Sequence, residues 1–128
     1  MKDNFIIKLK PYPFYIMVSL GEKQKELSKA LKKQKVNCNK ECVKVPGSAG
    51  YFMPFSNSVL LIRAKAFPTS PTAMGILQHE ILHCVFYIMK MVGIKLGDKS
   101  EEAYTYLHEH ITEEVLKRIK KNEKRKNR

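Results

Sequence analysis

The chain has 128 residues, of which 44% are hydrophobic and 28% are charged, and this length predicts one domain built around one core. The composition excludes a globally disordered chain, and no run reaches the roughly twenty apolar residues of a membrane-spanning helix. Lys and Arg outnumber Asp and Glu by 24 to 12, and the resulting net charge of +12 predicts affinity for acidic or polyanionic partners.

The cysteines favour a reducing compartment. Cys38, Cys42 and Cys84 are an odd number in a chain long enough to build a core without disulfides, so we expect a cytoplasmic protein. The Cys38 to Cys42 spacing suits either half of a metal site or two unpaired thiols, and the absence of a second ligand pair favours thiols. Cys84 is expected to be a small buried core residue.

The first predicted elements are a strand and a helix. Residues 14–20 are mostly β-branched or aromatic and lie between Pro13 and Gly21, a pattern typical of a buried strand rather than a signal peptide. Residues 22–35 place Leu27 and Leu31 at helical spacing among lysines, which predicts an amphipathic surface helix.

A loop and a hairpin follow. Residues 36–50 lack a sustained period and predict a loop with room for a short strand at 43–45. Residues 51–55 and 59–64 flank a Ser-Asn-Ser turn and predict a hairpin, in which Pro54 makes the first arm an edge or irregular strand.

The C-terminal half predicts two helices. Ser70-Pro71 is a typical helix start and Gly93 a typical end, so a helix is expected over 71–92, and its nearly all-round apolar surface makes it the central helix. A last helix is expected over about 99–120. Residues 1–120 would then form the domain, and 121–128 a basic, frayed tail.

The central helix carries the sequence His79-Glu80-Ile-Leu-His83, an H-E-x-x-H motif. The i, i+4 spacing puts both imidazoles on one face, where their ring nitrogens can bind one Zn²⁺ ion. Glu80 flanks that face as a candidate general base that takes a proton from zinc-bound water. Burying these polar groups in so apolar a helix is costly unless they are paired or bind metal, which favours zinc over a structural explanation.

A catalytic zinc site usually has a third protein ligand. The metzincin extension is excluded, because Phe86 and Met89 stand where it needs Gly and His. A short turn brings the start of the last helix back, which favours Glu101 and Glu102. Glu102 shares a face with Tyr106, and that face is expected to turn inward, so Glu102 is preferred to Glu101. The other downstream candidates are Asp98, His108, Glu109 and His110.

This arrangement, with a Gly93-Ile94 turn and Glu-Ala-Tyr-Thr-Tyr-Leu at 102–107, resembles the small phage-encoded zinc metallopeptidases of the gluzincin type. The resemblance covers about residues 71–116. It implies a minimal zincin fold with His79, His83 and Glu102 as zinc ligands and Glu80 as the catalytic base. It also implies the host cytoplasm, or the virion, as the location.

Two further roles stay open at this point. Tyr106, one turn beyond Glu102, suits either an oxyanion-stabilising hydroxyl or an ordinary packed tyrosine, and packing is the more frequent case. Residues 59–64 suit either an edge strand that pairs with an extended substrate or an internal strand of the sheet.

The expected fold is therefore α+β: a minimal zincin-like domain in which a small antiparallel or mixed sheet packs on the H-E-x-x-H helix, with a C-terminal helix. The expected function is hydrolysis of peptide bonds in a peptide or protein substrate with one Zn²⁺ ion. Two alternatives remain, namely a zinc-binding structural, virion or host-interaction protein without turnover, and a basic nucleic-acid-associated protein.

The positive charge lies in two segments. Residues 21–45 hold eight lysines against three glutamates, and residues 116–128 hold eight Lys and Arg against one Glu, so together they account for the whole net charge. The H-E-x-x-H region is neutral overall. The two segments are expected to dock an acidic or polyanionic partner or to keep the protein soluble.

Overall fold

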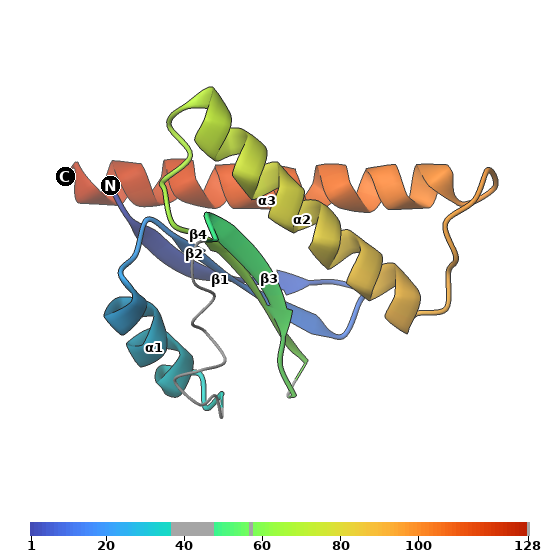
Figure 1. The fold of residues 1–128 in the computed structure, drawn as a ribbon, viewed down its shortest axis with the longest axis horizontal. Coiled ribbons are helices and arrows are strands. Elements are labelled where there is room, and N and C mark those ends of the chain that lie inside the picture. The colour runs from blue at the N-terminus through green and yellow to red at the C-terminus, as the bar shows by residue number, and fades with distance from the viewer. Residues whose placement is uncertain (37–47, 57, 128) are drawn as a thin grey trace.

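The computed structural model describes residues 1–36, 48–56 and 58–127 (Figure 1). In these residues it contains four strands and three helices. Their order is β1 (Asp3–Leu9), β2 (Phe14–Leu20), α1 (Gln24–Lys33), β3 (Gly50–Pro54), β4 (Val59–Ala64), α2 (Pro71–Met91) and α3 (Glu101–Lys126). The predicted α+β class is confirmed. The predicted strand at 43–45, and with it Cys38 and Cys42, lies outside the described residues.

The four strands form one mixed sheet in the order β1-β2-β4-β3. Strands β2 and β4 pair in parallel, with Ile16 opposite Leu60, and β1 and β3 pair antiparallel on the two outer sides. The hairpin of β3 and β4 confirms the sequence prediction, and β3, which ends in Pro54, is an edge strand as expected. Strand β1 was not expected from the sequence.

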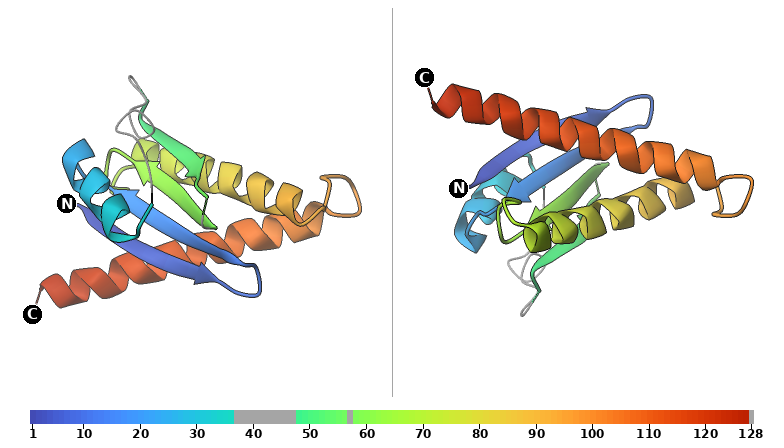
Figure 2. Two further views of the ribbon diagram at one scale, coloured as in Figure 1. Left: turned by 90° about the horizontal axis from the view of Figure 1, so that it is seen from below. Right: turned by 90° about the horizontal axis from the view of Figure 1, so that it is seen from above.

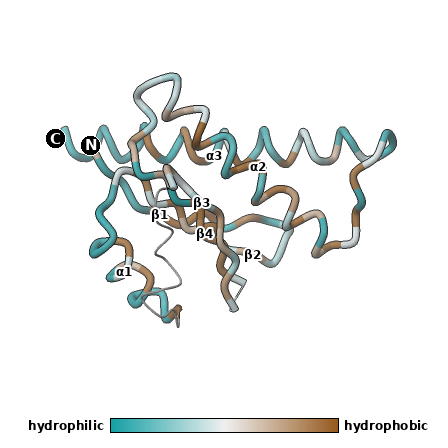
Figure 3. Tube along the Cα trace, in the orientation of Figure 1, coloured by the Kyte–Doolittle hydropathy of each residue, from teal (hydrophilic) through white to brown (hydrophobic). Residues whose placement is uncertain are grey.

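The two faces of the sheet carry different helices (Figure 2). Helices α2 and α3 cover one face and enclose the larger core, to which Ile16, Ile62 and Ile81 contribute. Helix α1 covers the other face, where Leu27 and Leu31 pack against Met17 and Leu61. Hydrophobic residues accordingly concentrate on the strands, and hydrophilic ones on α1 and toward the end of α3 (Figure 3).

Helix α2 matches the predicted bounds to within one residue. The Ser70 hydroxyl accepts a hydrogen bond from the Ala73 amide at 3.1 Å, and Pro71 takes the first helical position, where its missing N–H costs nothing. The helix packs on β3 and β4 on one side and on α3 on the other. It therefore holds the H-E-x-x-H residues between the β3 edge of the sheet and α3.

Helix α3 is longer than the sequence predicts. It continues to Lys126, so the expected end at Lys120 and the frayed tail are wrong. The Asn122 side chain donates hydrogen bonds to both carboxylate oxygens of Asp3, at 3.0 and 3.1 Å, and the Lys126 ammonium donates to the Lys2 carbonyl at 2.7 Å. These contacts fix the end of the helix to the start of β1.

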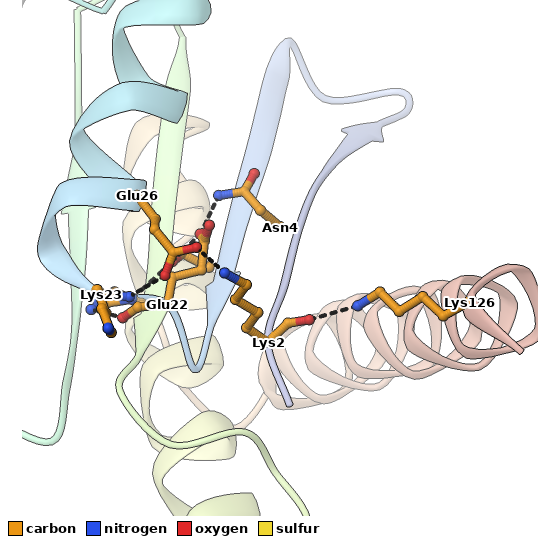
Figure 4. A network of polar contacts seen from close by, with 8 residues as sticks. Lys2, Asn4, Glu22, Lys23, Glu26 and Lys126 are labelled. Atoms are coloured by element: carbon orange, nitrogen blue, oxygen red, sulfur yellow. Dashed lines mark hydrogen bonds and ion pairs between the residues drawn. The ribbon is translucent and has the colours of Figure 1, made fainter.

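The same end of the molecule carries a polar network that joins β1 to α1 (Figure 4). Lys2 forms an ion pair with Glu26 of α1. The Glu22 carboxylate accepts hydrogen bonds from Asn4 at 2.5 Å and from Ser19 at 2.7 Å. The N-terminal strand is therefore tied both to α1 and to the end of α3. Within the described residues, none of the helices is both long and apolar enough for a membrane crossing.

Candidate metal centre

His79 and His83 lie one turn apart on the solvent-facing side of α2. Their Nε2 atoms are 3.2 Å apart, and the rings meet edge to face at 72°. Two ligands that each sit 2.0–2.1 Å from a tetrahedral zinc ion are about 3.3 Å from one another. The pair therefore has the separation that chelation of one ion requires, although one neutral imidazole donating to the other explains the distance equally well.

Glu80 is the charged residue of α2 that the fold buries, with 6% of its side chain exposed. Its Oε1 lies 3.8 Å from Nε2 of His79, and its buried Oε2 has no hydrogen-bond partner among the described residues. Burial raises the pKa of the Glu80 carboxyl, while the nearby His79 and His83 act in the opposite direction. A buried carboxylate with an unpartnered oxygen calls for a cation or a proton close by.

These three residues together form a possible metal site. One donor atom from each of His79, Glu80 and His83 lies within 4.8 Å of the others. Two imidazoles and a carboxylate are donors that suit zinc. The prediction that His79 and His83 share one face of α2, with Glu80 flanking it, thus agrees with the structure.

A cleft of about 380 Å³ adjoins the group between the start of β3 and the first turns of α2. Its walls are Ala49, Gly50, Thr72, Gly75 and Ile76, with His79 and Glu80 at one end. A Cβ at Gly50 would come within 2.6 Å of the Arg63 carbonyl oxygen, so only glycine fits there. The two glycines leave backbone rather than side chains exposed to the cleft.

The structure does not bring Glu102 to this group. Glu102 is exposed, and it lies about 180° around α3 from the buried Ile111, at 100° per residue. Tyr106 is 65% exposed, and His110 is exposed as well. The expectation that this face of α3 turns inward is therefore wrong, and Tyr106 is not packed in the core.

A different face of α3 meets α2. Glu101, Tyr104, Thr105 and His108 line a groove of about 330 Å³ with Leu82, Phe86 and Leu96. The Thr112 hydroxyl, further along this side, donates to the Gln78 side chain at 3.1 Å. The apolar positions at 104, 107, 111 and 115 form the buried stripe that sets this orientation, and their spacing was visible in the sequence.

Two other sequence expectations are decided by the structure. Strand β4 is internal, so the edge next to the cleft belongs to β3 instead. Cys84 is fully buried, as expected of a core residue, and burial raises the pKa of its thiol to about 12.

Comparison of the chain with models of protein families, with curated proteins and with solved structures found no match.

Proposed function

We propose that this protein is a zinc-dependent metallopeptidase in which His79 and His83 hold the ion and Glu80 acts as the general base. The observation that carries the proposal is the 3.2 Å separation of the two Nε2 atoms beside a buried, partly unpartnered carboxylate. The i, i+4 spacing of the two histidines in the H-E-x-x-H motif supports it. The expected cofactor is one Zn²⁺ ion and the expected substrate is a peptide or protein.

Bound zinc supplies a Lewis acid that polarises a carbonyl and lowers the pKa of water toward about 7. Glu80 supplies proton transfer through its Oε1, which lies 3.8 Å from Nε2 of His79. The cleft lined by Gly50 and Gly75 gives a peptide backbone close access to Glu80. Among the described residues β3 is an edge strand that borders this cleft, and an extended substrate can add to such an edge by backbone pairing.

The test is the substitution Glu80→Gln, which keeps the size of the side chain and removes its charge. We expect zinc content, measured by plasma mass spectrometry, to stay at the wild-type level, and cleavage of a peptide library to fall by about 100-fold or more. Cleavage at the wild-type rate would rule out Glu80 as the base.

Two control variants calibrate the zinc measurement. His83→Ala is expected to lose the ion, because one imidazole of the pair is removed. Glu102→Ala is expected to keep it, because Glu102 is exposed on the far side of α3. Loss of zinc from Glu102→Ala would restore the ligand that the sequence favours.

A second candidate, a zinc-binding protein without turnover, is favoured by one observation. The His79, Glu80 and His83 group already offers three donor atoms within 4.8 Å, so Glu80 itself is available as a ligand. In that case Glu80→Gln loses zinc, and the wild-type protein cleaves no peptide of the library.

A further inference from the structure

A basic groove lies between the edge strand β1 and the second half of α3, away from the H-E-x-x-H residues. It has a volume of about 260 Å³. Four of its seven lining residues are cationic and one is acidic; the seven are Ile6, Ile7, Lys8, Glu114, Lys117, Arg118 and Lys121. The groove therefore has an excess of positive charge at neutral pH.

Helix α3 extends this charge beyond the groove. At 100° per residue, Lys117, Lys121 and Lys124 fall within about 60° of one another on the helix surface, and Arg125 lies next to them. Glu123 points about 160° away from Lys121, whereas Lys117 forms an ion pair with Glu113 at 2.9 Å. These residues, together with the groove, define a continuous surface that we call the basic stripe.

The fold holds the basic stripe in place. The Arg118 guanidinium donates to the Ile6 carbonyl at 3.2 Å and lies 5.6 Å from the centre of the Phe5 ring. The bonds from Asn122 to Asp3 fix the next turn. The helix backbone that carries these cations is thus held in place, and positioning them for a ligand costs less conformational entropy than it would on a free tail.

We propose that the basic stripe binds the phosphate backbone of double-stranded nucleic acid. Lys117 to Lys124 spans about 10 Å at 1.5 Å per residue, the axial length of about three phosphates of one strand. The groove is lined by no aromatic side chain, so stacking on unpaired bases is absent there. Its apolar residues, Ile6 and Ile7, are half-buried and buried in β1, so neither is placed to enter a bilayer.

The lysines of α1 are not part of this surface. Helix α1 packs on the opposite face of the sheet from α3, so its lysines face elsewhere. Binding is also separate from the metal centre, because α2 meets a different side of α3 from the one that meets β1.

The experiment measures binding of the full-length protein to a fluorescent 20-base-pair duplex of random sequence by anisotropy, between 50 and 200 mM salt. The test variant carries Lys121→Gln, Lys124→Gln and Arg125→Gln. The control variant carries Lys90→Gln, Lys95→Gln and Lys99→Gln, which remove the same charge at or beside the α2–α3 connection, at the far end of α3 (Figure 1).

Wild-type protein is expected to bind, with an affinity that falls steeply as salt rises. The test variant is expected to bind about tenfold more weakly. The slope of its log affinity against log salt concentration should also be smaller in magnitude by about 2 to 3, because each lost phosphate contact reduces that slope by about 0.9. The control variant keeps wild-type affinity to within about twofold.

If both variants lost the same affinity for the duplex, the loss would be due to net charge rather than to the basic stripe, and the proposal would be overturned. The absence of duplex binding at 50 mM salt, or binding through these residues to phosphatidylserine vesicles but not to the duplex, would overturn it as well. Circular dichroism melting of both variants excludes unfolding as the cause of any loss.

Discussion

Gly50 and Gly75 both line the cleft beside Glu80, but their surroundings differ. A Cβ at Gly50 would meet the Arg63 carbonyl oxygen at 2.6 Å, the Ile76 Cγ2 at 3.1 Å and the Glu80 Cγ at 3.4 Å. A Cβ at Gly75 would meet nothing within 4 Å. The first glycine is required by a close backbone contact, whereas the second lies in the interior of α2 with open space around it.

This contrast predicts opposite effects of the same methyl group. Gly50→Ala should lower the free energy of unfolding by about 1–3 kcal/mol, because the backbone of β3 or β4 must shift. Gly75→Ala should raise it by about 0.5–1 kcal/mol, because alanine is favoured in a helix interior. Urea unfolding of the two variants measures both values, and a loss of stability in Gly75→Ala would contradict the open space seen beside it.

At the level of single residues, the sequence was a good guide where the geometry is local. His79 and His83 share a face because every α-helix places i and i+4 side by side. The position of Glu102 could not be judged from its own i, i+4 neighbours. It depends on which stripe of α3 is buried, and the stripe through Leu107 and Ile111 turns Glu102 to solvent.

At the level of elements, local pattern located the 14–20 strand, the hairpin and α2 but missed β1. In β1 every second residue is buried, namely Phe5, Ile7 and Leu9. Ile6 is hydrophobic as well, because it packs on the α1 side of the sheet, so the sequence does not show the alternation of apolar and polar residues that marks a strand. The end of α3 was missed for another reason. Its contacts with Asp3 and Lys2 join residues more than 100 positions apart, which local pattern does not reveal.

The bond between the two ends of the chain gives a prediction at this level. In a double-mutant cycle of Asp3→Ala and Asn122→Ala, the coupling energy should be about 1 kcal/mol, because the pair is half-buried and one partner is charged. Guanidinium unfolding of the four proteins measures it. Lys120→Ala, on an exposed turn of α3, serves as the control and should leave the free energy of unfolding unchanged. A coupling energy near zero between Asp3 and Asn122 would show that other contacts hold the end of α3.

At the scale of the whole molecule, the fold separates two chemistries that the sequence places on one chain. The candidate metal centre lies on α2 beside the β3 edge, whereas the basic stripe runs along α3 beside β1, the opposite edge of the sheet. Composition alone predicts a polyanion binder and the motif alone predicts a zinc protein. The two predictions are compatible because α2 and the basic end of α3 lie at opposite edges of the sheet.

Metal binding by the native state also predicts a change in the stability of the whole domain. Zn²⁺ at about 100 times its dissociation constant should stabilise the fold by about 2.7 kcal/mol, which for a chain of this size raises the Tm by about 10 °C. Mg²⁺, which prefers oxygen ligands, should leave the Tm unchanged. Differential scanning fluorimetry of metal-free protein measures both shifts.

The matched variant for this measurement is His79→Ala with His83→Ala, which retains all three cysteines. It should lose the zinc-dependent shift, and a chelator should reverse the shift of the wild type. If zinc raises the Tm of the variant as much as that of the wild type, zinc binds through other residues. The 3.2 Å histidine pair would then be an ordinary hydrogen bond on an exposed helix face.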